Sequence, residues 1–364
     1  MARPKSKRIV AAMSGGVDSS LAAALLKKEG YDTIGVTFRM WPKEECGSSF
    51  GRSCCNLEAV TRARAVAQGL GIPYYVVDFS EEFKREVIDY FCEEYLKGNT
   101  PNPCVVCNEK IKFGHLLEKA VSLGASAVAT GHYANANLDK KSGRYLLKEG
   151  KDKRKDQSYF LFRLSQEQLK RAVFPLGSLM KEKVRALAKR MRLKTFNTVS
   201  SQDICFVQDL KYAEYIKKKT GVEIKAGETV DKDGKALGRH KGIPFYTIGQ
   251  RRGLGIAHKE PLYVTGIDIE KNRLIVGPRA GVMKKSLVAE RMNWISIECL
   301  DKPIKVMARI RYNHKKVKAI VTKITADSVR VDFDEPQAAP TPGQAVVFYD
   351  KDIVIGGGWI KSAN

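Results

Sequence analysis

Residues 14–20, with the sequence Ser-Gly-Gly-Val-Asp-Ser-Ser, restrict the fold of this chain more than any other segment. They follow a short apolar run at residues 9–13 and precede the helical pattern of residues 21–26. Glycines let the backbone approach a ligand and adopt positive φ, while the first amides of a helix attract an anion. The serines add hydroxyl donors, and Asp18 is suited to orient them or to hold a magnesium ion. This order of strand, glycine turn and helix predicts a phosphate-binding loop.

Two better-known phosphate loops do not match this segment. A Walker loop requires a lysine directly after its last glycine, and no lysine stands at that place. A dinucleotide-binding turn requires Gly-x-Gly-x-x-Gly, and the glycines here are spaced differently. The motif Ser-Gly-Gly-x-Asp-Ser instead resembles the pyrophosphate loop, or PP-loop, of the ATP pyrophosphatases. That resemblance implies an enzyme that splits ATP between its α and β phosphates and passes AMP to a carbonyl oxygen.

Strand and helix patterns alternate along the first 130 residues. Apolar runs typical of strands are followed by amphipathic helices, with strands expected at residues 33–41, 74–79 and 125–130 and helices at 57–70, 80–96 and 108–123. The alternation predicts βαβ units and therefore an α/β N-terminal domain with a doubly wound parallel sheet, as in the adenine nucleotide α-hydrolases. Ligands of such sheets bind at the carboxyl ends of the strands, where Ser14, Phe38 and Gly131 are expected.

The middle of the chain mixes a hairpin with further helices. The hairpin is expected at residues 133–150, and the helices at residues 156–164, 166–172, 181–191 and 212–220. Beyond residue 221 the pattern changes to short strands, expected at residues 245–248, 263–267 and 273–276, with a hairpin turn at 232–234. Short strands separated by turn residues predict a small central β domain.

The C-terminal part alternates apolar and polar residues along each expected strand. Val306, Ala308 and Ile310 face one way, while Lys305 and Arg309 face the other. Several such strands in succession predict a small antiparallel β-barrel. We therefore expect three domains: a catalytic PP-loop domain at residues 1–211, a central β-rich domain at residues 212–280, and a C-terminal barrel at residues 281–364.

Charge and composition favour a nucleic-acid partner. The 364 residues are 43% hydrophobic, enough for a full core, and carry a net charge of +24. Such a surplus attracts a polyanion through long-range steering and counterion release, although a generally basic proteome would give the same charge. The basic N-terminus is followed by only five apolar residues before the glycine loop, too few for a signal-peptide core or a membrane span. We expect a cytoplasmic protein without a membrane partner.

The eight cysteines are scattered, which does not indicate a disulfide framework. Cys104 and Cys107 form a Cys-x-x-Cys pair after a proline-rich loop, at the expected start of a helix, where the helix dipole favours thiolates. Half of a zinc site is an alternative, but no second pair follows at zinc-ribbon spacing. Cys205 lies in a polar segment at residues 200–206 and is either a half-buried structural thiol or a sulfur carrier.

Taken together, the motifs resemble those of the tRNA-specific 2-thiouridylases, the MnmA family, over essentially the whole chain. The motifs occur in the family's order at residues 14–19, 100–103, 107–108, 130–133, 155–161, 203–206 and 249–255. The resemblance implies an ATP-dependent transferase that adenylates the C2 carbonyl of uridine 34 in the tRNA anticodon and replaces its oxygen with sulfur. It also implies ATP and Mg²⁺ at the loop and a separate protein that donates the sulfur.

The resemblance further assigns roles to individual residues. Cys205 is expected to carry a persulfide and Cys107 to be the second catalytic cysteine, with a disulfide between them after transfer. The residues expected to bind ATP are Ala12, Met13, Ser14, Gly15, Gly16, Val17, Asp18, Ser19, Phe38 and Gly131. The target base is expected to contact Asn102, Pro103 and Cys104. The residues expected to contact tRNA are His132, Lys155, Asp156, Gln157, Arg311, Tyr312 and Gln344.

Cys104 departs from the family pattern, because many family members have aspartate at this place. The substitution creates a set of three thiols, Cys104, Cys107 and Cys205, which could ligate a [4Fe–4S] cluster that carries the sulfur. Cluster-dependent thiolation is therefore an alternative to the persulfide. Two further alternatives are another PP-loop tRNA-modifying ligase, which needs neither Cys107 nor Cys205, and an inactive RNA-binding protein with this fold.

Overall fold

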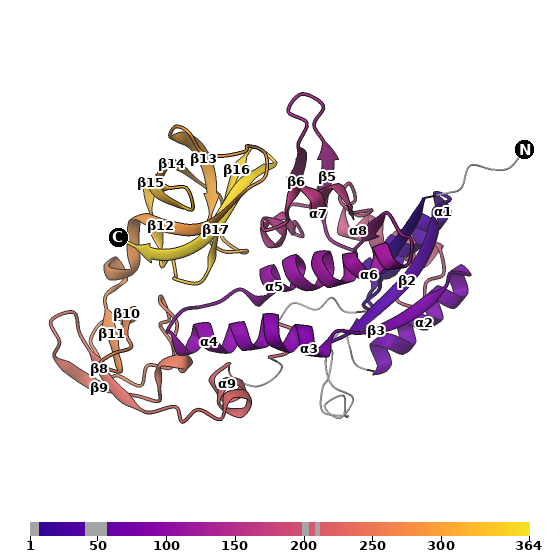
Figure 1. The fold of residues 1–364 in the computed structure, drawn as a ribbon. Coiled ribbons are helices and arrows are strands. Elements are labelled where there is room, and N and C mark those ends of the chain that lie inside the picture. The colour runs from indigo at the N-terminus through magenta and orange to yellow at the C-terminus, as the bar shows by residue number, and fades with distance from the viewer. Residues whose placement is uncertain (1–6, 41–56, 199–203, 208–211) are drawn as a thin grey trace, which may run out of the picture.

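The computed structural model describes residues 7–40, 57–198, 204–207 and 212–364 (Figure 1). Trp41 of an expected strand and residues 200–203 of the Cys205 segment lie outside the described residues. The strands of the described part form three sheets, of five, four and eight strands. Among the described helices, none is long and apolar enough to cross a membrane.

The N-terminal sheet is parallel and has the strand order β3-β2-β1-β4-β7. The strands are β1 (Arg8–Ala12), β2 (Asp32–Arg39), β3 (Tyr74–Asp78), β4 (Ala127–Ala129) and β7 (Ala172–Val173). Strand β1 lies at the centre, and its alternate residues face opposite sides. Ile9 and Ala11 pack with one hydrophobic cluster and Val10 with another. The doubly wound sheet expected from the sequence is confirmed.

Helices cover both faces of this sheet. On the side of Ile9 lie α1 (Val17–Lys28), α2 (Leu57–Leu70) and α8 (Lys181–Arg190). On the other side lie two longer helical runs, which extend from the sheet toward the β-rich half of the molecule (Figure 1). The first comprises α3 (Ser80–Phe83), η2 (Lys84–Asp89) and α4 (Tyr90–Leu96); the second comprises α5 (Pro103–Val106), η3 (Cys107–His115) and α6 (Leu116–Ser122).

Several expected elements differ from the observed ones. The helix expected at residues 108–123 begins at Pro103, because proline has a φ suited to the first helical position. The helix expected at 156–164 is only a 3₁₀ turn, η4 (Ser158–Leu161), and the next, α7 (Gln166–Lys170), stops before strand β7. The strand expected at 245–248 is absent among the described strands, and the short 3₁₀ turn η5 (Ile243–Phe245) ends at the first residue of that range.

The central sheet has the order β10-β11-β8-β9. It contains β8 (Gly227–Val230) and β9 (Ala236–His240), joined by the expected turn, together with β10 (Tyr263–Asp268) and β11 (Arg273–Gly277). Helix α9 (Tyr212–Thr220) precedes this sheet, and the 3₁₀ turn η6 (Arg279–Val282) follows it. Val264, Leu274 and Val276 form its small apolar core.

The C-terminal strands close into the expected antiparallel barrel. Their order is β12-β15-β14-β13-β16-β17, and a further pairing of β12 with β17 closes the ring. The strands are β12 (Met283–Trp294), β13 (Ile304–Arg309), β14 (Val317–Thr325), β15 (Ser328–Ala338), β16 (Ala345–Asp350) and β17 (Ile353–Ala363). Val306, Ala308 and Ile310 lie in its core, as the alternation predicted.

The hairpin of β5 (Ala134–Leu138) and β6 (Tyr145–Glu149) connects the N-terminal domain to the C-terminal barrel. It follows β4 of the N-terminal sheet in sequence, yet β6 pairs with β17 and so extends the barrel sheet to eight strands. The hairpin was expected from the sequence, but its attachment to the barrel was not. The barrel is therefore linked to the N-terminal domain by a continuous sheet.

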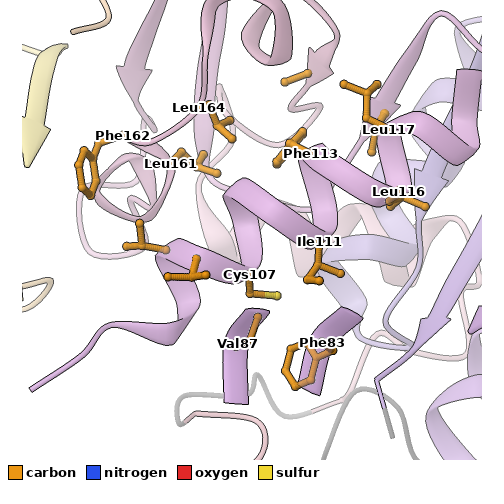
Figure 2. Close-up of a cluster of buried hydrophobic side chains, with 14 of the residues drawn as sticks. Phe83, Val87, Cys107, Ile111, Phe113, Leu116, Leu117, Leu161, Phe162 and Leu164 are labelled. Atoms are coloured by element: carbon orange, nitrogen blue, oxygen red, sulfur yellow. The ribbon is translucent and has the colours of Figure 1, made fainter. Parts of the chain in front are cut away.

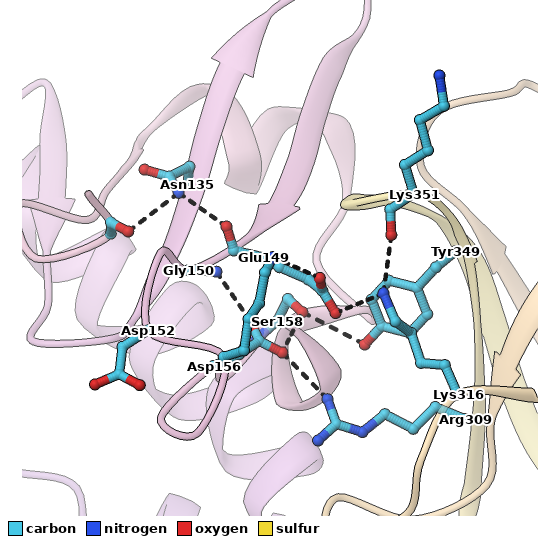
Figure 3. A network of polar contacts seen from close by, with 12 residues as sticks. Asn135, Glu149, Gly150, Asp152, Asp156, Ser158, Arg309, Lys316, Tyr349 and Lys351 are labelled. Atoms are coloured by element: carbon cyan, nitrogen blue, oxygen red, sulfur yellow. Dashed lines mark hydrogen bonds and ion pairs between the residues drawn. The ribbon is translucent and has the colours of Figure 1, made fainter. Parts of the chain in front are cut away.

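A buried polar network strengthens this link (Figure 3). Asp156 is only 2% exposed and accepts hydrogen bonds from the backbone amides of Gly150 and Ser158. Its carboxylate also forms an ion pair with the Arg309 guanidinium at 3.2 Å. Glu149 pairs with Lys316 of the barrel at 2.9 Å. Burial raises the pKa of Asp156, whereas the hydrogen bonds from Gly150 and Ser158 lower it.

Replacing Arg309 by methionine should lower the free energy of unfolding by about 3 kcal/mol, because a buried carboxylate loses its only cationic partner seen in the described ion pairs. Three hydrogen bonds to Asp156 remain, which keeps the cost at the lower end of the range for broken buried pairs. Urea unfolding measures the loss. The matched control is Arg330→Met, which breaks the exposed pair with Asp332 and should cost about 1 kcal/mol or less. Equal losses in the two variants would contradict a stabilising role of the buried pair.

Candidate active site

The expected phosphate loop connects β1 to α1 at the carboxyl edge of the parallel sheet. Gly15 has φ of 72°, and a Cβ at this position would lie 2.4 Å from the carbonyl oxygen of Ala59 in α2. Only glycine therefore fits at this turn. The hydroxyl of Ser19 accepts from the Ser14 amide at 3.1 Å and lies 3.2 Å from the Ser14 hydroxyl. The loop thus gathers backbone amides and two hydroxyls at the start of a helix, an arrangement that suits an anion.

Asp18 is held by two side chains from distant parts of the chain. The ammonium of Lys181 lies 2.6 and 2.7 Å from its two carboxylate oxygens, and the hydroxyl of Tyr133 donates to one of them at 2.7 Å. Burial, followed by the nearby Asp18 carboxylate, raises the pKa of Tyr133 and keeps its hydroxyl protonated as a donor. The loop carboxylate is therefore fixed in position and neutralised by a cation.

The other residues expected to bind ATP lie at the same edge of the sheet. Gly131 follows β4, and a Cβ there would be 2.8 Å from the backbone of Asp18 and Ser19, so this strand end packs directly against the loop. Phe38 lies near the end of β2, and its ring centroid is 6.3 Å from that of Phe79. The apolar surface at Phe38 and the donors of the loop suit the base and the phosphates of a nucleotide, respectively.

The magnesium ion that the sequence assigns to Asp18 stays a prediction, since both carboxylate oxygens of Asp18 contact the Lys181 ammonium in the structure. Mg²⁺ is usually bound by one or two carboxylates together with substrate phosphates. Asp18 is the carboxylate within the loop, and its present partners are Lys181 and Tyr133.

Cys104 and Cys107 lie in the first turns of a helical run that begins at Pro103. Cys104 is partly exposed, whereas Cys107 is buried, with 9% of its surface exposed. Figure 2 shows Cys107 on the helix face turned toward Phe83 and Val87, within the apolar cluster that also contains Ile111. Both cysteines are thiols. The helix thus places one thiol near the surface and the other against a packed apolar layer.

Cys205 is brought to the same layer by its neighbour in the sequence. The ring of Phe206 packs on Phe83 with centroids 5.9 Å apart, on Phe91 at 5.0 Å and on Tyr215 at 5.5 Å. Cys205 itself is partly exposed and packs against the same cluster as Cys107. Phe83 therefore contacts Phe206, the residue after Cys205, and lies on the side toward which Cys107 is turned in Figure 2.

The described residues contain no group of three or more histidine, cysteine or acidic side chains arranged to hold a metal ion. This finding concerns a single ion, whereas the cysteines of a [4Fe–4S] cluster bind different iron atoms, so the cluster alternative with Cys104, Cys107 and Cys205 stays a prediction. A cluster would require the three thiols to come together around it.

The segment that precedes Cys104 is held by the C-terminal barrel. The Gln344 side-chain amide donates to the carbonyl oxygens of Thr100 at 2.9 Å and Pro101 at 3.3 Å, and the Thr100 amide donates to the carbonyl of Pro342. The hydroxyl of Tyr159 donates to the Ala345 carbonyl at 2.9 Å and also meets the Asn102 side chain. Residues expected to contact the target base are thus positioned by the barrel.

The residues expected to contact tRNA are placed differently from one another. His132 and Asp156 are buried, whereas Lys155, Gln157, Arg311, Tyr312 and Gln344 are partly exposed. The Gln157 side-chain oxygen accepts from the Tyr133 amide at 3.1 Å, and Arg311 donates to Thr341 at 3.0 Å. Three of these residues make contacts that connect the barrel to the N-terminal domain: Asp156 with Arg309, Tyr312 with Phe160, and Gln344 with Thr100.

His132 is enclosed between Phe113 and Phe174, whose ring centroids lie 6.4 and 6.1 Å away. One ring nitrogen lies 2.7 Å from the Thr130 hydroxyl. Burial, and after it the charge of nearby Lys112, lowers the pKa of His132 well below its ordinary value. The imidazole is therefore neutral at neutral pH. Lys112 in turn donates to Asn108, the residue after Cys107.

Sequence reasoning missed three residues at the loop. Lys181 and Tyr133 hold Asp18, and the Thr198 hydroxyl accepts from the Val17 amide at the start of α1, at 3.1 Å. Tyr133 belongs to a motif that the sequence did single out, although without a role. Lys181 and Thr198 lie more than 160 residues from the loop, and no local pattern marks them.

Comparison with known proteins gives a consistent picture along the chain. Residues 7–209 match the tRNA methyl transferase HUP domain, residues 213–278 the tRNA methyl transferase PRC-barrel domain, and residues 284–360 the aminomethyltransferase beta-barrel domain. The chain is 52% identical over 357 residues to the tRNA-specific 2-thiouridylase MnmA 2 of Thermoanaerobacter sp. (strain X514), covering 98% of each chain. It is 48% identical over 358 residues to the tRNA-specific 2-thiouridylase MnmA of Clostridioides difficile (strain 630), covering 98% of this chain and 99% of that one.

The lowered pKa of His132 predicts a pH-dependent loss of stability. Below about pH 6.5 the unfolded chain binds a proton at this histidine that the folded chain does not, so the free energy of unfolding falls as the pH decreases. The contribution approaches about 1.4 kcal/mol per pH unit between the unfolded and folded pKa values. His132→Asn should therefore show a shallower decrease between pH 6.5 and 5 in urea unfolding. Parallel curves for the variant and the original protein would contradict this.

Proposed function

The chain belongs to the family of tRNA-specific 2-thiouridylases, and from this premise we propose that it converts uridine 34 of the tRNA anticodon to 2-thiouridine in an ATP-dependent reaction. We propose that Cys205 carries the sulfur as a persulfide and that Cys107 releases it. The observation that carries this proposal is the packing of the Cys205 segment and Cys107 against one apolar layer around Phe83, on the helices that flank the sheet bearing the phosphate loop.

The first half of the reaction activates the uridine. A uracil carbonyl oxygen is a poor leaving group, so AMP is transferred to it and pyrophosphate departs. The glycine turn at Gly15, the amides at the start of α1 and the hydroxyls of Ser14 and Ser19 would hold the phosphates. The apolar ring of Phe38 would pack on adenine. The tight contact of Gly131 with the loop would hold the end of β4 against the start of α1.

The second half replaces oxygen with sulfur. The terminal sulfur of the Cys205 persulfide attacks C2, and AMP leaves with the former carbonyl oxygen. The Cys107 thiolate then attacks the Cys205 sulfur and breaks the persulfide bond, and its electron pair passes to the sulfur on C2, which becomes the thiocarbonyl. A Cys107–Cys205 disulfide results. An external thiol must reduce it, and a sulfur-donor protein must reload Cys205.

The apolar layer around Cys107 suits such chemistry, because a persulfide and an adenylated base are both open to attack by water. Cys107 is buried between helix faces, whereas Cys104 and Cys205 are partly exposed and thus accessible to a base entering from outside. An anticodon base is single-stranded and can be turned out of its stack into a pocket. Asn102 and Pro103 lie at the end of the segment that the barrel holds, where they would contact that base.

The charge of the chain supports binding of a tRNA. The net charge of +24 favours a polyanion, and Arg251 and Arg252 are exposed in a glycine-rich loop of the central domain. This loop surrounds an open pocket of about 600 Å³ that is lined by residues 251 and 253–262. Exposed arginines next to glycines can approach phosphates closely, so we propose that this loop contacts the tRNA backbone.

Replacing Cys205 by serine should abolish 2-thiouridine formation, because a hydroxyl cannot carry a persulfide. ATP affinity should be unchanged, since Cys205 lies on the helical layer and not in the phosphate loop. The assay supplies tRNA, ATP, a thiol and a persulfide donor and detects thiouridine by nucleoside mass spectrometry; calorimetry measures ATP binding. Thiolation by the serine variant at the original rate would contradict the persulfide role. Cys299→Ser, an exposed thiol of the barrel, is the matched control and should remain active.

Replacing Cys104 by aspartate, the residue common in the family, distinguishes the persulfide from an iron–sulfur cluster. The persulfide route needs only Cys107 and Cys205, so the variant should retain 2-thiouridine formation within about tenfold. Iron and acid-labile sulfide are measured in anaerobically purified protein, both original and variant. Iron and sulfide in the original protein that disappear together with activity in Cys104→Asp would overturn the persulfide route in favour of the cluster.

A further inference from the structure

Arg62 on α2 reaches across to the phosphate loop that precedes α1. Its Nε atom donates a hydrogen bond to the carbonyl oxygen of Gly15 at 3.2 Å, and one of its Nη atoms forms an ion pair with Glu58, one turn earlier on α2. Two acceptors thus fix the guanidinium, and 31% of the side chain is exposed. Arg62 lies outside every motif of the sequence, so only the packing of α2 places it at the loop.

The hydrogen bond from Arg62 fixes the orientation of the Gly15–Gly16 peptide. Gly15 has φ of 72° and lies directly against α2, since a Cβ there would collide with the Ala59 carbonyl. Its own carbonyl is directed toward Arg62 of that helix. A trans peptide bond is planar, so its C=O and N–H groups point in opposite directions. The N–H of Gly16 therefore points away from Arg62.

The Gly16 amide belongs to the group of donors that the loop offers to an anion. Gly16 is the residue directly before α1, and backbone N–H groups at the start of a helix bind phosphates when they point at the ligand. A cation on the Gly15 carbonyl also polarises this peptide, and hydrogen bonds that share a peptide strengthen one another. Arg62 therefore both orients the Gly16 N–H and makes it a stronger donor.

We propose that Arg62 is a positioning residue of the phosphate site, which holds the Gly15–Gly16 peptide so that the Gly16 N–H points at the pyrophosphate part of ATP. The ligand class is a pyrophosphate group, either free or within a nucleoside triphosphate. In this role Arg62 acts through the backbone and needs no contact with the ligand. The inference rests on the proposed binding of ATP at the loop.

Two substitutions separate the hydrogen bond of Arg62 from its charge. The amide nitrogen of glutamine is as many bonds from Cα as the Nε of arginine, so Arg62→Gln keeps a donor at this place without a charge. Methionine has a side chain of the same length without a donor, so Arg62→Met removes both the hydrogen bond and the charge. Lys28→Met, at the exposed end of α1, is the matched control, because it removes one positive charge at the opposite end of the helix from the loop.

Arg62→Met should weaken binding of MgATP and of free pyrophosphate by about threefold to tenfold, as expected for the loss of one hydrogen bond. Arg62→Gln should stay within about twofold of the original protein, because the donor is retained. Binding of AMP should change by less than about twofold in both variants, since AMP lacks a pyrophosphate group. Lys28→Met should leave all three affinities unchanged. Calorimetry on the full chain without tRNA measures them.

Equal losses of pyrophosphate affinity in Arg62→Gln and Arg62→Met would overturn the inference, because the charge of Arg62 and not the positioned peptide would then decide binding. An unchanged pyrophosphate affinity in Arg62→Met, or an equal loss for ATP and AMP, would overturn it as well. Urea unfolding of each variant verifies that the chain is folded. An original protein that binds neither ATP nor pyrophosphate would instead refute the proposed function itself.

Discussion

The buried carboxylate of Asp156 connects the two halves of this molecule. It is enclosed by the turn between β6 and η4, which supplies three hydrogen bonds, and by Arg309 of the barrel, which supplies the charge (Figure 3). Because a buried charge without a partner is costly, this pair stabilises the mutual arrangement of the turn and the barrel. The adjacent pairing of β6 with β17 adds backbone hydrogen bonds between the same two parts.

The position of the candidate base site follows from that connection. Gln344 lies beside the same interface and holds the segment before Cys104 through the Thr100 and Pro101 carbonyls, and Tyr159 donates to the carbonyl of Ala345, the residue after Gln344. The barrel is therefore more than an appended surface for RNA, since its loops position the segment that precedes both thiols of the helix. A tRNA that binds the barrel would therefore contact the same domain that holds the segment before Cys104.

The phosphate loop depends on a second long-range ion pair. Asp18 and Lys181 join α1 to α8, and Tyr133 adds the strand end that follows β4. The three elements are far apart in the sequence but meet at one edge of the parallel sheet. The loop is consequently held in shape before any nucleotide is present, which reduces the cost of ordering it on binding.

Local patterns in the sequence determined the order of strands and helices, the phosphate loop, the helix at Cys104 and Cys107, and the alternation of the barrel. These features depend on period, turn residues and capping, which neighbouring residues encode. The sequence also directed attention to Asp156 and Gln344, but as residues for RNA contact. Only the tertiary structure decided that Asp156 is buried against Arg309, that the hairpin of β5 and β6 extends the barrel, and that Lys181 faces Asp18. Those outcomes depend on which surfaces pack together over more than a hundred residues, and no local period records that choice.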